Sequence, residues 1–244
     1  MRATPFAPTA FPIVFLLLVA GCELGGGPRI DGVGPVVSQI RTVGSFSGID
    51  LRSSAEVVVS QGDTPEVRVE AQQNILDILK TDVHGHTLRI EYFGNYNVHT
   101  HQPVKVYVTT PMLRETTISG SGSIASSATW KSDTFRADIS GSGKLDLRVS
   151  GTRDLHASIS GSGGVKLAGD AASTTLNISG SGNVRAYELS AQDVNISISG
   201  SGSADVNAAR TLSGGISGAG SVHYLGRPIV KCHVSGSGSV NPAN

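Results

Sequence analysis

The chain has 244 residues, which allows one or two domains, and 31 of them are glycine. Charged residues make up 16 % and aromatic residues 5 %, and the 19 basic residues balance the 19 acidic ones. Nucleic-acid binding needs clustered positive charge, so this balance excludes a strongly basic, nucleic-acid-binding domain. Apolar residues recur at regular spacing through the second half, which argues against a disordered chain.

Residues 1–21 predict a signal peptide of the lipoprotein type. An apolar stretch covers residues 11–20, which is too short for a permanent transmembrane helix but suits an export signal. Small residues then precede Cys22, a pattern similar to the lipobox of bacterial lipoproteins. The resemblance implies cleavage before Cys22, a lipid such as palmitate on it, and, because Glu23 follows, sorting to the outer membrane. The alternative is an ordinary secretory peptide with an incidental cysteine.

Between this segment and the repeats, the sequence predicts a spacer and an irregular region. Residues 22–41 are rich in glycine and proline, which favours a flexible tether between lipid and folded domain. Residues 42–115 form the less regular half of that domain, with alternating apolar residues that predict strands at 57–59, 67–69, 88–92 and 104–108. Ile75, Leu76 and Leu79 lie at helical spacing, so one short helix is predicted at 72–80.

Residues 116–240 contain the clearest pattern, a motif of the type Ile-Ser-Gly-Ser-Gly. Seven copies occur at a spacing of 18 to 21 residues. They begin at Ile118, Ile139, Ile159, Ile178, Ile198, Ile216 and Val234. A period near 20 residues is typical of solenoids, in which each repeat forms one coil and stacks on its neighbours. We therefore predict an all-β fold, a parallel β-helix with about 20 residues per turn.

Each repeat predicts a strand, a glycine corner and a second strand. Before the corner, apolar and polar residues alternate, so that Leu155, Ala157 and Ile159 share a buried face. Glycine tolerates positive φ and close backbone approach, which suits a corner stacked on identical corners. The predicted structural turn residues are Gly120, Gly122, Gly141, Gly143, Gly161, Gly163, Gly180, Gly182, Gly200, Gly202, Gly218, Gly220, Gly236 and Gly238.

Taken together, residues 42–240 resemble the GIN domain, the DUF2807 family of auto-transporter adhesin head domains. The resemblance rests on the Ser-Gly-Ser-Gly turns and on motifs of the first half at 46–49, 57–62, 88–90 and 106–111. It implies a right-handed parallel β-helix that is exported to the cell envelope. It implies no catalytic activity for named residues, because fold alone does not give function.

Charged side chains in two neighbouring repeats are the candidates for chemistry. A carbohydrate-active β-helix enzyme, either a polysaccharide lyase or a hydrolase, needs carboxylates or a base gathered on one wall. The candidates are Lys144, Asp146, Arg148, Lys166 and Asp138. Their signs alternate along the chain, which favours a solvated face over an active site. Convergence of such residues from adjacent turns in a groove distinguishes the two readings.

The histidines and the second cysteine complete the candidate sites. His84 and His86 form one His-x-His pair, and His99 and His101 form another, but no third ligand follows from the sequence. We therefore predict no metal and no cofactor. Alternation places Cys232 on the apolar face of a strand, which favours a buried hydrophobic role.

These observations predict a lipid-anchored, outer-membrane β-solenoid that adheres, binds or scaffolds without catalysis. Its partners are then the membrane, through lipid on Cys22, and an envelope or surface ligand such as a polysaccharide or a protein. Solenoid ends present unpaired strand edges, so a homo-oligomer is a further expectation. The alternative function is the carbohydrate-active enzyme described above.

Overall fold

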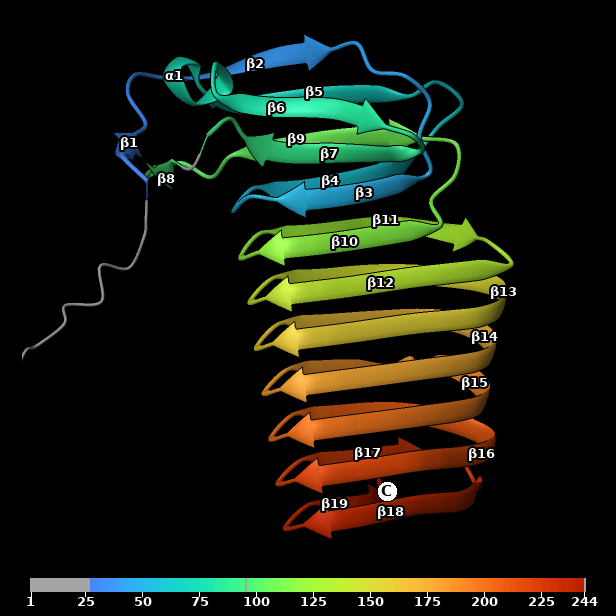
Figure 1. The fold of residues 1–244 in the computed structure, drawn as a ribbon. Helices are drawn as coiled ribbons and strands as arrows, with labels where there is room; N and C mark the ends of the chain where they lie inside the picture. Colours follow the sequence, from blue (N-terminus) through green and yellow to red (C-terminus); the bar gives the residue numbers. More distant parts are fainter. Residues whose placement is uncertain (1–26, 95, 244) are drawn as a thin grey trace, which may run out of the picture.

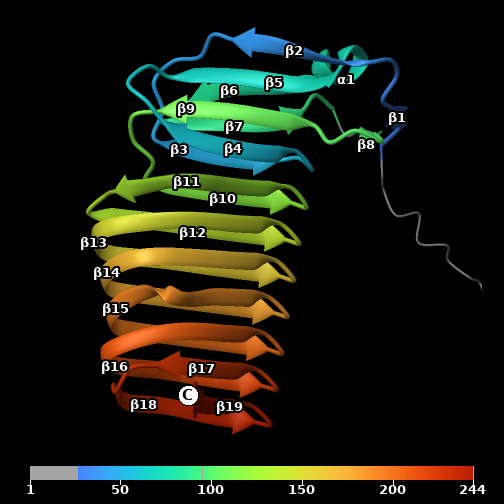
Figure 2. The same ribbon diagram turned by 180° about the vertical axis from the view of Figure 1, so that it is seen from behind.

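The computed structural model describes residues 27–94 and 96–243 and shows one elongated solenoid of stacked coils (Figure 1). Each regular coil has one strand on the face toward the viewer in Figure 1, here called the front face, and one on the opposite back face (Figure 2). Seen from the N-terminal end, the coils wind clockwise as they move away, so the solenoid is right-handed. The all-β solenoid expected from the repeats is confirmed.

The N-terminal half closes one end of the solenoid. Its elements are β1 (Arg29–Asp31), β2 (Val36–Arg41), β3 (Gly48–Arg52), β4 (Glu56–Gln61), β5 (Glu66–Gln72), α1 (Gln73–Leu76), β6 (Leu79–His84), β7 (Thr87–Tyr92), β8 (Asn97–His99) and β9 (Lys105–Thr110). Strand β6 is antiparallel to β7, and β5 is antiparallel to both β9 and β2. We call β2, β5, α1 and β6 the N-terminal cap, because antiparallel pairing ends the parallel stack here.

The C-terminal half is a regular parallel stack. Its strands are β10 (Glu115–Gly120), β11 (Ser123–Lys131), β12 (Thr134–Gly141), β13 (Lys144–Gly161), β14 (Gly164–Gly180), β15 (Asn183–Gly200), β16 (Ser203–Gly218), β17 (Ser221–Leu225), β18 (Ile229–Gly236) and β19 (Ser239–Pro242). Strands β13 to β16 each continue from the back face around a bend onto the front face. Equivalent motif residues pair across coils, as Ile139 with Ile159 and Gly141 with Gly161.

One continuous hydrophobic core runs through both halves. The motif isoleucines form a ladder inside it, and each is at most 2 % exposed. These are Ile118, Ile139, Ile159, Ile178, Ile198 and Ile216. Burial of this repeated apolar ladder is the main stabilising contribution, because a single coil has no apolar interior of its own.

The two glycines of each corner are needed for different reasons. The first, from Gly120 to Gly236, has φ between 115° and 156°, a region that L side chains rarely adopt. At Gly161 an added Cβ lies 2.5 Å from the Gly141 carbonyl oxygen, which accepts the Ser162 amide at 2.9 Å. The second glycine makes room for the isoleucine of the preceding coil. A Cβ on Gly163 would lie only 2.6 Å from Cγ2 of Ile139.

Two expectations for the N-terminal half differ from the structure. The tether expected at 22–41 contains β1, which pairs with β8, and β2, which pairs along its length with β5. Its glycines and prolines therefore mark turns between strands, at least from residue 29 onward. The helix expected at 72–80 is only the four-residue α1, because Leu79 already begins β6 and pairs with Tyr92 of β7.

Candidate functional site: a basic hollow beside the glycine corners

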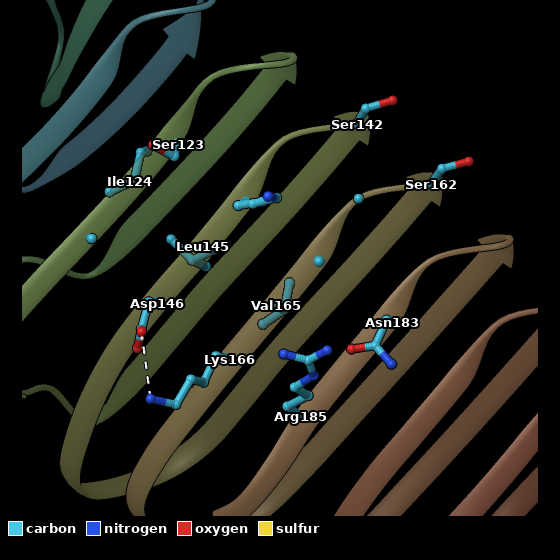
Figure 3. A pocket seen from close by; sticks show the side chains of 14 residues that line it. Ser123, Ile124, Ser142, Leu145, Asp146, Ser162, Val165, Lys166, Asn183 and Arg185 are labelled. Atoms are coloured by element: carbon cyan, nitrogen blue, oxygen red, sulfur yellow. Dashed lines mark ion pairs between the residues drawn. The ribbon is translucent and has the colours of Figure 1, made fainter. Parts of the chain in front are cut away.

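A shallow hollow of about 460 Å³ lies on the back face, next to the glycine corners of successive coils. Strands β11, β13, β14 and β15 and the corners before β13 and β14 supply its lining residues, and Figure 3 shows Asp146, Lys166 and Arg185 on neighbouring coils around it. The parallel register produces this gathering: Asp146 pairs with Lys166, and Lys166 pairs with Arg185. Side chains about one strand spacing apart, near 4.8 Å, therefore project from the same surface.

The hollow carries an excess of positive charge. Lys144, Lys166 and Arg185 line it together with a single acidic residue, Asp146, whose carboxylate lies 3.5 Å from the Lys166 amine. Within residues 27–94 and 96–243, neither Lys144 nor Arg185 has a carboxylate at ion-pair distance. The hollow therefore has two positive charges in excess, and such a patch attracts anionic groups.

Gly164 lines the hollow and, having no side chain, leaves space there. Neither its backbone conformation nor its packing requires glycine at this position. Its φ lies outside the positive region, and an added Cβ meets only the Asn183 carbonyl oxygen, at 4.0 Å. The equivalent positions on the adjacent coils are Lys144 and Asn183, so a side chain fits in this column elsewhere. Gly164 thus differs from the corner glycines, because an added Cβ there meets neither strain nor a clash and would only occupy space in the hollow.

Rows of serine hydroxyls border the hollow along the corners. Ser142 and Ser162 point outward from two consecutive corners, next to the hollow (Figure 3). A second row of serines lies on the front side of the same corners. Each of these serines pairs in register with the serine of the next coil, and all of them are exposed. This row contains Ser140, Ser160, Ser179 and Ser199, and it extends to Ser217 and Ser235. Hydroxyls donate and accept hydrogen bonds, so the rim suits a polyhydroxylated ligand.

The structure separates the five charged residues that the sequence offered as candidates. It brings Lys144, Asp146 and Lys166 together in the hollow. Asp138 lies on the front face, where Arg136 donates to it at 2.6 Å, and Arg148 pairs with Glu188 at 3.3 Å. Three of the five residues expected on a solvated face therefore converge in one hollow, and a single carboxylate, that of Asp146, is among them.

Arg185 was missed by the sequence analysis. It stands three residues after Gly182, as Lys166 does after Gly163 and Asp146 after Gly143. Aligning the repeats on the second glycine of the corner places these three residues in one column. That alignment would have identified Arg185 from the sequence, since equivalent positions of a solenoid stack directly on one another.

A second hollow, of about 310 Å³, lies on the front face where β3, β6 and β7 of the N-terminal half meet β10 of the C-terminal half. Asp50 is almost fully buried there and accepts from Arg52 at 2.9 Å and from Arg89 at 3.3 Å. Glu115 also lines this hollow. Its two arginines and two carboxylates balance, so it lacks the excess charge of the hollow on the back face.

The remaining predicted sites are dispersed. His84 ends β6 and His86 lies in the following turn, whereas His99 ends β8. Across the described ranges, no three His, Cys, Asp or Glu residues gather as metal ligands do. Cys232 is only half-buried, because β18 belongs to the last described coil, and burial raises the pKa of its thiol. Cys22 lies outside the described residues.

Comparisons with known proteins agree on family and fold. The family model described as "Putative auto-transporter adhesin, head GIN domain" matches residues 45–228. A putative adhesin structure from Bacteroides fragilis aligns with a TM-score of 0.80 at 24 % identity, covering 88 % of this chain and all of that one. A putative lipid binding protein from Parabacteroides distasonis aligns at 0.74 with 26 % identity, covering 88 % and 100 %. A putative adhesin from Parabacteroides merdae aligns at 0.69 with 24 % identity, covering 89 % and 100 %. No curated protein sequence matches the chain.

Proposed function

The chain belongs to the family of auto-transporter adhesin head GIN domains, and from this membership we propose that it is a lipid-anchored, non-catalytic adhesin of the cell envelope. Its ligand, in this proposal, is an acidic polysaccharide held at the basic hollow. The family and its structural relatives support adhesion or binding at a surface. The anchor rests on Cys22 and the apolar segment before it. No helix among the described residues is long and apolar enough to cross a membrane.

The excess of positive charge in the hollow is the observation that carries the ligand proposal. Lys144, Lys166 and Arg185 come from three consecutive coils, so they match a ligand with repeated carboxylates better than a single anion. The serine hydroxyls at the rim and the open floor at Gly164 suit sugar rings that bring hydroxyl groups. A neutral polymer makes no use of the three cations.

Catalysis is less well supported by the same hollow. Glycoside hydrolysis generally uses two carboxylates on either side of the scissile bond, and among the described residues Asp146 is the only acidic one that lines the hollow. Its carboxylate already lies beside the Lys166 amine. A lyase, which acts on acidic polysaccharides, stays the alternative, since cations also neutralise a substrate carboxylate during proton abstraction.

Calorimetric titration of the full chain with oligogalacturonate tests the ligand proposal. We expect the double variant Lys144→Gln/Lys166→Gln to bind at least about tenfold more weakly, since each charged contact is worth on the order of 1.5 kcal/mol. Gly164→Gln fills the hollow without changing its charge and is expected to weaken binding similarly. The matched control, Lys131→Gln/Lys231→Gln, removes two exposed lysines outside the hollow and leaves the affinity unchanged.

Equal weakening by the control would show a general charge effect and contradict the hollow as the site. Analysis of the same oligosaccharide after incubation separates the two functions. Recovery of intact oligosaccharide is expected of an adhesin, whereas products with an unsaturated uronate end identify a lyase.

The anchor is tested by expressing the full chain and Cys22→Ala in a Gram-negative host fed a radiolabelled fatty acid. We expect label on the wild type alone, in the outer-membrane fraction, because the variant lacks Cys22, the cysteine that directly follows the apolar segment. Release of both proteins as soluble, unlabelled chains would instead indicate an ordinary secretory peptide.

A further inference from the structure

Exposed apolar side chains gather at the N-terminal end of the solenoid. Nine large hydrophobic residues are exposed in the described part of the chain, and five of them lie on or next to the N-terminal cap. These are Val33, Val36, Val37, Ile40 and Phe93. Val33 is 70 % exposed and Ile40 67 %, so neither contributes to the core. Strand β2, which carries three of the five, is the outermost strand of this end in both views (Figures 1 and 2).

Arg41 fixes the orientation of this outermost strand. Its guanidinium donates to the Leu76 carbonyl at 2.8 Å and to the Leu79 carbonyl, so its side chain turns inward over α1 and β6. Alternation along the strand then directs Ile40 to the opposite, outer side. The exposure of Ile40 is therefore set by a specific anchor on its neighbour, not by fraying of a loose edge.

Phe93 adds an amphipathic pair to the same end. The amide of Phe93 donates to the Ile78 carbonyl at 2.6 Å, which holds the exposed ring beside the cap. The Lys80 amine lies 4.3 Å from the centre of that ring. An apolar ring flanked by an ammonium group is suited to the boundary between lipid headgroups and acyl chains.

The chain length between the lipid and the cap restricts what these side chains can meet. Cys22 precedes Gly27, the first described residue, by five positions. Five residues span at most about 18 Å when fully extended. The Pro28 carbonyl is already bonded to the Asn97 amide, at 3.2 Å, so the folded domain starts there. If Cys22 carries lipid, Gly27 is held within that distance of the bilayer, which brings β1 and the neighbouring N-terminal cap close to the membrane.

We propose that the N-terminal cap docks on the lipid surface, with Val33, Ile40 and Phe93 inserted at the headgroup boundary. This inference rests on the lipid anchor of the proposed function and adds a second membrane contact to it. An apolar contact beside the lipid adds buried apolar area and so strengthens attachment. The solenoid then stands away from the membrane, and the coils that form the basic hollow face the surroundings.

The test attaches the full chain to vesicles by chemistry, so that it does not depend on natural lipidation. Unprocessed chain bearing Cys232→Ser is coupled through Cys22 to a maleimide phospholipid in vesicles of phosphatidylethanolamine and phosphatidylglycerol. Tryptophan fluorescence is then measured with phospholipids brominated in the acyl chain, which quench only inserted rings. Trp130 is fully buried and gives a constant background.

We expect quenching of the added tryptophan in Phe93→Trp, by about half or more, and none in Ile229→Trp, which places the probe on β18 at the opposite end. Adding Val33→Ser/Ile40→Ser leaves the attachment unchanged and is expected to remove most of the quenching. Quenching that survives this double substitution shows that Val33 and Ile40 do not hold the cap on the lipid and overturns the proposed docking, as does an unquenched Phe93→Trp. Failure of the fatty-acid labelling experiment, in contrast, bears on the anchor and not on this measurement.

Discussion

The two halves of the solenoid close their coils by different means. In the C-terminal half every corner carries the glycine pair, and the first glycine has positive φ. In the first coil, the corner between β3 and β4 contains Ser53 and Ala55 in its place, and no described residue other than glycine has positive φ. After β7 the chain leaves toward β8, which pairs with β1, so it does not turn over that corner.

This difference shows what the glycines are for. Amides of Gly122 and Ser123 donate to the Ser53 and Ala55 carbonyls, so the first glycine corner stacks directly on an ordinary one. A Cβ on Gly122 lies 2.6 Å from both of these carbonyl oxygens. A corner thus needs glycine when it stacks on a preceding corner, and ordinary residues suffice in the coil that begins the stack.

The sharpest way to break this comparison is Gly161→Val. Its φ of 123° and the 2.5 Å approach of an added Cβ to the Gly141 carbonyl oxygen combine strain with a clash against backbone. We expect the free energy of unfolding to fall by about 4 kcal/mol or more, with loss of folded protein on thermal denaturation followed by circular dichroism. The matched control is Gly164→Val, only three residues away in open space, which is expected to change stability by less than about 1 kcal/mol. Equal damage by both would refute the distinction between corner and surface glycines.

The N-terminal half depends on individual polar contacts, and Arg41→Met tests this dependence. Methionine keeps the apolar stem but leaves the Leu76 and Leu79 carbonyls without the guanidinium. We expect a loss of about 1–3 kcal/mol, seen as faster hydrogen exchange in β2 and β6 while β13 to β16 stay protected. Arg29→Met, which removes an exposed ion pair with Asp31, is the control and is expected to leave hydrogen exchange in β2 and β6 unchanged. Uniform exchange across all coils would contradict separate stabilisation of the two halves.

The smallest effect is expected for Tyr92→Phe in the N-terminal half. The hydroxyl is buried without a hydrogen-bond partner among the described residues, and burial raises the pKa of this phenol. Tyrosine in the unfolded chain ionises near pH 10, whereas the folded one holds its proton to higher pH. Stability is therefore lost as the pH rises above about 10, and the variant is expected to lose less. Near neutral pH, urea titration is expected to show a change within about 1 kcal/mol.

Much of the fold was predictable from the repeats alone. The isoleucine ladder, the parallel register and the corners all follow from one motif at a nearly constant period, since equivalent residues of a solenoid must stack. The N-terminal half was predicted less well. Its strands β4, β5, β7 and β9 lie where alternation placed them, but β1 and β2 were hidden in a segment whose glycines and prolines suggested a spacer.

The sequence by itself determined the solenoid, its period and the lipobox-like segment at Cys22, because these depend on local patterns that repeat or stand alone. Tertiary structure decided which charged residues meet. Lys144, Asp146 and Lys166 gather in one hollow with Arg185, whereas Asp138 lies on the other face, since a bend in each coil divides its residues between two surfaces. Tertiary structure also decided that Gly164 faces open space in the hollow and that β2 exposes its apolar side chains. Both properties depend on contacts with parts of the chain that are distant in sequence.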